Sequence, residues 1–300
     1  MKILITGGTG FVGTHLSHAC MDAGHEVTVL GTRTLPAQGD PPLLNRVAAD
    51  TTRPGPWQTD AAAADLIFNL AGRNIFQRWN RKTKRQIYES RILTTRNLVA
   101  ALPEDGAAVL ISTSAVGYYG DCGDIELNEE SPVGTDFLAS LARDWEREAL
   151  KAEAKGVRVV LARFGVVLGR GGGALAKMIP AFKSFMGGPL GNGRQWFPWI
   201  HVRDLVKALT FLARRSDLAG PFNLCAPCPV TNAAMARALG KALGRPAKLP
   251  VPAFMVRMMA GELGNVMLAS QRTLPVRLLR AGFEFDYRHI DGALAAIVGP

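Results

Sequence analysis

The residues best suited to binding chemistry lie near the start of the chain, in the segment TGGTGFVG that follows the apolar run 2–6. Its glycines recur every third position, between a predicted strand and a predicted helix. The first glycine permits a tight turn, the second lets the backbone approach a pyrophosphate, and the third lets the helix pack close to the strand. We predict a dinucleotide site at the helix N-terminus, formed by Gly7, Thr9, Gly10, Phe11, Val12 and Gly13.

The end of the second predicted strand indicates which dinucleotide this site prefers. An NAD site carries an Asp or Glu about 20 residues after the glycines, where it holds the ribose 2′-hydroxyl. Here the segment 31–34 reads GTRT, and the next acid is Asp40. Thr32 and Arg33 are placed to bind a 2′-phosphate, the arginine through two parallel N–H···O bonds. NADP(H) is therefore favoured over NAD(H); the alternative is that Arg33 is only a solvated charge.

Alternating apolar strands and helices are expected to position these residues. Such alternation, with nearly every strand apolar, is typical of an α/β fold with a doubly wound parallel (Rossmann) sheet covered on both faces. Strands are predicted over 2–6, 25–30, 46–50, 64–72, 107–114 and 156–165, and helices over 11–23, 81–102 and 136–155.

The regular alternation stops after about residue 165. Glycine-rich connections follow at 171–173 and 187–193, and one further strand is predicted over 221–225. We predict an NAD(P)-binding domain over 1–165 and a smaller α-rich substrate lobe over 166–300 that interleaves with it. Helices of this lobe are predicted over 231–243, 252–260 and 274–281.

Composition and charge narrow the class of protein. Lys and Arg number 35 against 25 Asp and Glu, a net charge of +10, but the basic residues are spread along the whole chain. No nucleic-acid module accompanies them, so we expect an anionic small molecule as partner and no nucleic acid.

The longest apolar run is too short to cross a membrane. The N-terminal segment has too short an apolar stretch for a signal peptide, so we expect no membrane partner and a cytoplasmic location.

The four cysteines are too few and too scattered for a disulfide framework. Cys225 and Cys228 form a single CxxC pair with no second pair or histidines at matching spacing, so no metal site is predicted.

Three strand-end motifs reveal a resemblance. NLAG (69–72), STSAVGYYG (112–120) and RFGVVLG (163–169) resemble the extended short-chain dehydrogenase/reductases. Long motifs over 187–205, 226–246 and 249–283 are similar to an atypical subgroup, the "epimerase family" NAD(P)-dependent proteins, some of which carry an old cell-division inhibitor label. The resemblance covers essentially the whole chain. It also implies a homodimer, formed through the helices after the fourth and fifth strands.

The resemblance implies roles for the residues at these strand ends. Ser114 matches the hydroxyl residue that hydrogen-bonds the reacting oxygen. Arg91 matches a position facing the cofactor, where it would reach a phosphate or a substrate anion; the alternative is an exposed helix charge. The remaining cofactor positions are Leu70, Ala71 and Gly72 at the fourth strand and Arg163, Phe164 and Gly165 at the sixth.

One departure from the family bears on catalysis. Active members carry Tyr-xxx-Lys on the helix after the fifth strand, where the Tyr is the acid/base and the Lys lowers its pKa. The predicted helix 136–155 contains no such pair. Tyr118 and Tyr119 are the nearby phenols, and one of them is the candidate replacement; in relatives a Tyr there commonly packs or touches substrate.

The loop 187–199 occupies the place where relatives bind the substrate's nucleotide or sugar. Arg194 suits an anion, and Trp196 and Trp199 suit a stacked ring. The alternative is that these tryptophans, with Phe197, join the two lobes.

Two classes of function follow from these residues. The first is an NADP(H)-binding oxidoreductase or epimerase acting on a hydroxyl or carbonyl carbon of a substrate resembling a sugar nucleotide, with Ser114 polarising the oxygen. The second is a cofactor-binding sensor or regulator without redox chemistry, which the missing Tyr-xxx-Lys favours. Nucleic-acid binding comes third, resting on net charge alone.

Overall fold

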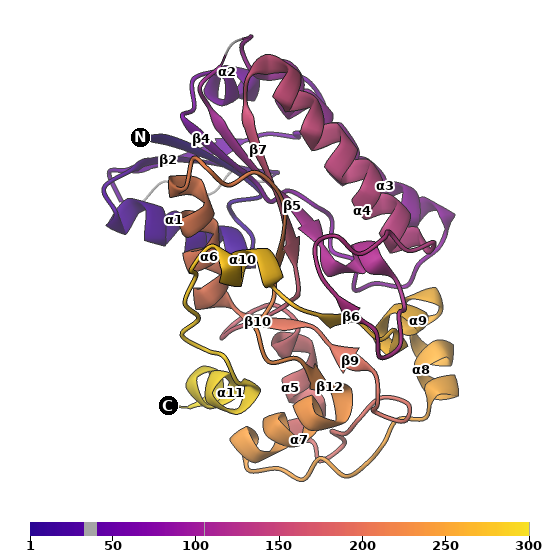
Figure 1. Cartoon of the computed structure of the whole chain (residues 1–300). Coiled ribbons are helices and arrows are strands. Elements are labelled where there is room, and N and C mark those ends of the chain that lie inside the picture. The colour runs from indigo at the N-terminus through magenta and orange to yellow at the C-terminus, as the bar shows by residue number, and fades with distance from the viewer. Residues whose placement is uncertain (33–40, 105, 300) are drawn as a thin grey trace.

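A parallel seven-stranded sheet forms the centre of the protein (Figure 1). The computed structural model describes residues 1–32, 41–104 and 106–299. The strand order is β11-β7-β5-β4-β1-β2-β3, with the change of direction between β1 and β4. In this order the strands are β11 (Gly220–Leu224), β7 (Arg158–Phe164), β5 (Val109–Ala115), β4 (Leu66–Asn69), β1 (Lys2–Thr6), β2 (Glu26–Gly31) and β3 (Leu44–Ala48).

Helices cover both faces of the sheet because its strands are apolar on both sides. Leu16 and Leu205 bury one face under α1 (Phe11–Asp22) and α6 (Val202–Arg214). The other face packs against α2, α3 and α4 through a second core that contains Trp57, Leu98 and Ala149. These three helices span Trp57–Ala62, Arg81–Ala101 and Phe137–Leu150.

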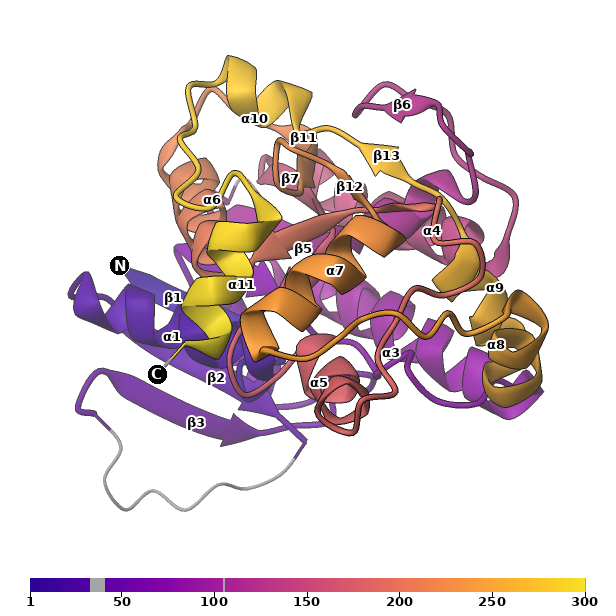
Figure 2. The same cartoon turned by 90° about the horizontal axis from the view of Figure 1, so that it is seen from below.

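The C-terminal region forms a second layer of helices at the carboxyl ends of the strands (Figure 2). Its own core gathers residues such as Phe182, Met235 and Leu294. The helices are α5 (Leu175–Lys183), α7 (Asn232–Leu243), α8 (Ala253–Ala260), α9 (Glu262–Leu268), α10 (Val276–Arg280) and α11 (Ile290–Val298). Short strands pair around them: β6 (Glu126–Leu127) with β13 (Arg272–Thr273), β8 (Val166–Leu168) with β10 (Trp199–His201), and β9 (Trp196–Phe197) with β12 (Val230–Thr231).

The predicted doubly wound sheet is confirmed, with differences at element ends. The third strand begins two residues earlier than predicted, and the helix predicted over 136–155 changes to a 3-10 helix, η2, at Lys151–Lys155. A second 3-10 helix, η1, covers Val116–Tyr119. The predicted helix ranges do not cover α2, α5, α6, α9 or α11. No helix in the described ranges is long and apolar enough to cross a membrane. The domain boundary at residue 165 stays a prediction.

Candidate active site

The glycine turn brings the end of β1 against the end of β4. Gly7 has a φ of 66°, and a Cβ there would lie 3.0 Å from the Ala71 backbone. A Cβ at Gly13 would lie 2.6 Å from the Gly7 carbonyl oxygen. The Gly10 N–H donates to that same oxygen at 2.9 Å. Since only glycine fits at Gly7 and Gly13, the backbone of the loop closes into the compact turn that the sequence predicts.

The start of α1 remains open above this turn. Gly10 is the N-cap residue, provides no side-chain cap, and is exposed together with Thr9. Among the described residues, a Cβ at Gly10 would meet only the Gly7 oxygen within 4 Å, so none of them fills the space beyond it. Uncapped N–H groups at a helix N-terminus attract anions. The residues present therefore fit a dinucleotide pyrophosphate.

The next two residues of α1 face protein. The Phe11 ring lies against a glycine loop, because a Cβ at Gly172 would lie 2.2 Å from a ring carbon. Val12 packs on the core beneath the sheet. Phe11 thus connects the glycine turn of residues 7–13 to the loop that follows β8.

The end of β2 lies beside this turn. A Cβ at Gly31 would lie 2.8 Å from the Thr9 side chain, and Thr32 is exposed. Arg33, the residue predicted to bind a 2′-phosphate, lies outside the described residues.

Arg91 is a residue of α3, and its guanidinium lies beside the exposed Gly72, just after β4. Its guanidinium donates to the carbonyls of Arg73 and Ile87, each at 3.1 Å, and its Cζ lies 5.2 Å from the centre of the Trp145 ring. Burial lowers the pKa of Arg91 to about 10. Among residues 1–32, 41–104 and 106–299, no acidic side chain forms an ion pair with it. A half-buried cation whose printed contacts among the described residues are carbonyls and a ring remains able to bind an anion. Leu70, half-buried, packs against the core under the sheet.

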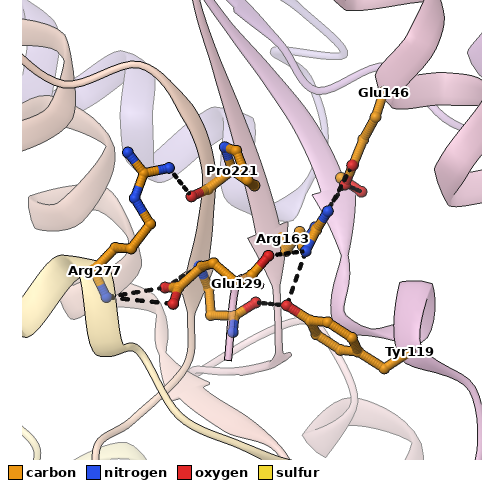
Figure 3. A network of polar contacts seen from close by, with 8 residues as sticks. Tyr119, Glu129, Glu146, Arg163, Pro221 and Arg277 are labelled. Carbon is orange, nitrogen blue, oxygen red and sulfur yellow. Dashed lines mark hydrogen bonds and ion pairs between the residues drawn. The ribbon is translucent and has the colours of Figure 1, made fainter. Parts of the chain in front are cut away.

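Ser114 is held in a buried polar network. Its Oγ donates to Glu146 Oε1 at 2.6 Å, and the residue is 1% exposed. Both oxygens of Glu146 accept from Arg163, each at 2.8 Å, as Figure 3 shows. Burial acts to lower the pKa of Arg163, but the bonds to Glu146 outweigh it and raise that pKa above its ordinary value.

Both candidate tyrosines contact the same arginine. Tyr119 donates to Asn223 Oδ1 at 2.7 Å, accepts from Arg163 at 2.9 Å, and is 1% exposed. Burial raises the pKa of Tyr119. The half-buried Tyr118 ring lies 3.6 Å from the Arg163 Cζ. Of the two, only Tyr118 retains part of its surface toward solvent.

Glu129 continues the network to the C-terminal region (Figure 3). Its carboxylate accepts from the backbone N–H of Asn223 at 3.0 Å and of Arg277 at 3.3 Å. Arg277 in turn donates to the Pro221 carbonyl. The network thus joins η1, α4, β7, β11 and α10. It holds the strand ends beside Ser114 in place.

Sequence reasoning did not single out Glu146, Glu129 or Asn223. The available signal was an acid on the inner side of the predicted helix 136–155: Glu146 follows Leu138 and Ala142 at four-residue intervals, which places all three on one helix face.

The other strand-end residues predicted at β7 face the protein interior. Phe164 packs against the core, and a Cβ at Gly165 would lie 3.1 Å from the Pro198 carbonyl oxygen.

The aromatic loop joins two parts of the chain. Trp196 Nε1 donates to Asp124 at 2.9 Å, and the Arg272 guanidinium lies 4.8 Å from its ring centre. Trp199 is buried in the C-terminal core, whereas Arg194 is exposed. These contacts support the alternative interpretation, in which the tryptophans join the lobes, and they leave Arg194 free to meet a ligand.

His201 makes the stability of this region depend on pH. It is the N-cap of α6, accepting from the Arg203 N–H at 3.0 Å, and stacks on Tyr287 at 3.9 Å. Burial is the largest cause that lowers the pKa of His201, followed by the positive charges of Arg203 and His15. Asp286 acts in the opposite direction, and the resulting pKa is about 4. Between pH 6.5 and 4 only the unfolded chain takes up this proton. We expect stability to fall by about 3 kcal/mol across that window as pH decreases.

The measurement is the midpoint of urea unfolding from pH 8 to pH 4, compared with His201→Asn. Asparagine keeps an N-cap acceptor but does not titrate. The variant should lose most of the pH dependence in this window. Equal slopes for both proteins would contradict the assignment.

No cluster of three or more His, Cys, Asp or Glu suited to a metal ion occurs in the described ranges.

A family model, the NAD dependent epimerase/dehydratase family, matches residues 3–225. The chain belongs to this family. A second model, a domain of unknown function (DUF1731), matches residues 251–297. The fold is the NAD(P)-binding fold of the family, and the predicted resemblance is confirmed.

Several members of the epimerase family align over nearly the whole chain. The epimerase family protein SDR39U1 homolog of Arabidopsis thaliana, described as chloroplastic, is 41% identical, covering 99% of this chain and 87% of its own. A Mycobacterium leprae epimerase family protein is 40% identical, covering 98% and 94%. The crystal structure of human epimerase family protein SDR39U1 with NADPH superposes with a TM-score of 0.88 at 35% identity, covering 99% of both chains. Thermus thermophilus UDP-glucose 4-epimerase with NAD shares the fold, at 18% identity and a TM-score of 0.77, covering 99% and 98%.

Proposed function

We propose that this epimerase-family protein is an NADP(H)-dependent oxidoreductase or epimerase that acts at a hydroxyl or carbonyl carbon of a small anionic substrate. The observation that carries the proposal is the open glycine turn beside Arg91, a cation without an acidic partner in the described ranges. The human relative crystallised with NADPH supports the choice of cofactor. We expect the activity to be cytoplasmic.

When bound, the dinucleotide supplies a hydride donor or acceptor. The chain's own residues hold and orient the reactants. Gly7, Gly10 and Gly13 hold the pyrophosphate, and Arg91 neutralises a phosphate or a substrate anion. A serine hydroxyl has one proton, and Ser114 donates it to Glu146. Toward a ligand, Ser114 is therefore a hydrogen-bond acceptor, which suits the hydroxyl group of an alcohol substrate.

The test is a titration with NADPH and NADH, monitored by energy transfer from tryptophan to nicotinamide. We expect tight NADPH binding and weak NADH binding. Arg91→Met should weaken NADPH binding about tenfold or more, since a charge-assisted bond to a buried cation contributes about 1.5–3 kcal/mol.

Arg85→Met is the matched control for this titration, because Arg85 lies on the same helix and pairs on the surface with Glu89. Its NADPH affinity should equal that of the wild type. Binding of neither dinucleotide would refute the proposal, and an unchanged affinity in Arg91→Met would remove Arg91 from the site.

A second function is favoured by the contacts of the two candidate phenols beside β5. Tyr118 and Tyr119 both contact Arg163, and the Tyr119 hydroxyl also donates to Asn223. A protein that binds NADP(H), carries no Tyr-xxx-Lys pair on helix 136–155 and holds Tyr119 in a buried network suits a sensor or regulator. The two functions differ in turnover. Reduction of NADP+ by any of a panel of alcohols, abolished in Ser114→Ala, supports the enzyme. Tight binding with no turnover over the panel supports the regulator.

A further inference from the structure

Helix α8 has an apolar side that faces outward. Phe254, Met258 and Met259 are 67%, 68% and 71% exposed, whereas Val256 is 5% exposed. Residues four apart share a helix face, so the three exposed side chains form one continuous strip. A surface helix ordinarily buries its apolar side and exposes its polar one. Helix α8 buries Val256 but leaves most of its apolar side chains exposed, which points to a contact that α8 makes outside the chain.

A neighbouring segment extends the apolar strip. The Gly191 N–H donates to the Val251 carbonyl at 2.8 Å, and the Val251 N–H donates to Pro189 at 2.9 Å. Through these bonds, residues 189–191, which follow α5, lie beside Val251, which precedes α8. Both views place α8 at the outer edge of the molecule (Figures 1 and 2). We name the resulting area the α8 surface; its exposed apolar residues are Phe185, Met186, Leu249, Phe254, Met258 and Met259.

The charged residues of the two segments that form the α8 surface are all basic. Residues 154–203 and 218–261 contain no Asp or Glu. Exposed cations border the apolar residues at Lys183, Arg245 and Lys248, and the Arg245 Cζ lies 4.7 Å from the Phe185 ring centre. Glu262, the first acid after this stretch, is already paired with Lys84.

We propose that the α8 surface docks on an anionic lipid bilayer. Phe and Met side chains partition into the boundary between headgroups and acyl chains, and Lys and Arg attract anionic headgroups. Two copies joined through this surface would bring like charges together, which disfavours self-association. The bilayer contact departs from the expectation that the protein has no membrane partner. The surface shares no residue with the proposed cofactor site, so the two proposals fail or succeed separately.

The experiment is co-sedimentation of the full chain with vesicles. Wild type should bind vesicles of phosphatidylcholine with phosphatidylglycerol and stay in the supernatant with phosphatidylcholine alone. Phe254→Ser with Met258→Ser and Met259→Ser should weaken binding by at least about tenfold, because three inserted side chains are lost. Ile125→Ser is the matched control: Ile125 is 68% exposed and lies before β6, outside the α8 surface.

Charge is tested separately. Arg245→Glu with Lys248→Glu should weaken binding at least about tenfold. Arg53→Glu should have a much smaller effect, because its side chain is 84% exposed and precedes α2, at the end of the molecule opposite α8 (Figure 1). Unchanged NADPH affinity and unfolding midpoint in each variant show that the fold is intact.

Three results would overturn the proposal: wild type that ignores anionic vesicles, equal binding by the triple serine variant, or a dimer in vesicle-free solution that the triple variant converts to a monomer. The last result would assign the α8 surface to contact between copies.

Discussion

Replacing Glu146 by alanine is expected to lower the free energy of unfolding by about 3–5 kcal/mol, because it leaves a buried charge without its partner. The side chains of Arg163 and Glu146 are only 4% and 8% exposed. Glu146 also accepts a hydrogen bond from Ser114, so the variant leaves a buried hydroxyl without its partner as well. The measurement is urea unfolding at neutral pH, with the midpoint and slope fitted together.

Glu89→Ala is the control, because Glu89 forms an exposed pair with Arg85 on the surface of α3. Its effect should stay below about 1 kcal/mol. The double variant Glu146→Leu with Arg163→Met should be more stable than Glu146→Ala, since no unpaired charge remains. A loss under about 1 kcal/mol in Glu146→Ala would show that the ion pair does not anchor the strand ends.

Replacing Gly10 by valine is expected to weaken NADPH binding by about 100-fold or more, equivalent to about 2.7 kcal/mol, while the protein stays folded. Gly10 has a φ of −81°, which any residue adopts. Among the described residues, an added Cβ would meet only the Gly7 oxygen, at 3.2 Å. The valine methyl groups would therefore compete for the space where the pyrophosphate is proposed to lie. The measurement is the NADPH titration, accompanied by the thermal unfolding midpoint.

Gly292→Val provides the comparison. Gly292 is exposed in α11, and a Cβ added there would have no other atom of the described residues within 4 Å, so the NADPH affinity of this variant should match that of the wild type. Wild-type affinity in Gly10→Val would place the dinucleotide elsewhere.

The sheet and the glycine turn were predictable because both depend on neighbours in the sequence. Apolar runs of strand length alternate with helices, and this pattern leads to a covered parallel sheet. The positive φ at Gly7 and the close contact at Gly13 are conditions that glycine alone satisfies. The cofactor preference rests on Arg33, which lies outside the described residues, so it stays a prediction.

The polar network beside Ser114 depended on the tertiary structure. Ser114 and Glu146 are 32 residues apart, and Tyr119 and Asn223 are 104 apart. No periodicity links residues at such separations. They meet because parallel strands place their carboxyl ends at one edge, and because β11, late in the chain, pairs with β7. The contact of Trp196 with Asp124 likewise joins residues that are 72 apart in the sequence.

The sequence by itself thus determined the sheet, the turn of Gly7 to Gly13 and the family resemblance, because local backbone sterics and apolar spacing act over short stretches. The tertiary structure decided which charges are paired and which remain free. Arg163 is neutralised by Glu146, whereas among the described residues Arg91 contacts carbonyls and a ring and no acid. Pairing is a property of distances between folded elements, and burial then makes each pairing decisive, since an unpaired charge is tolerated inside a protein only at high energetic cost.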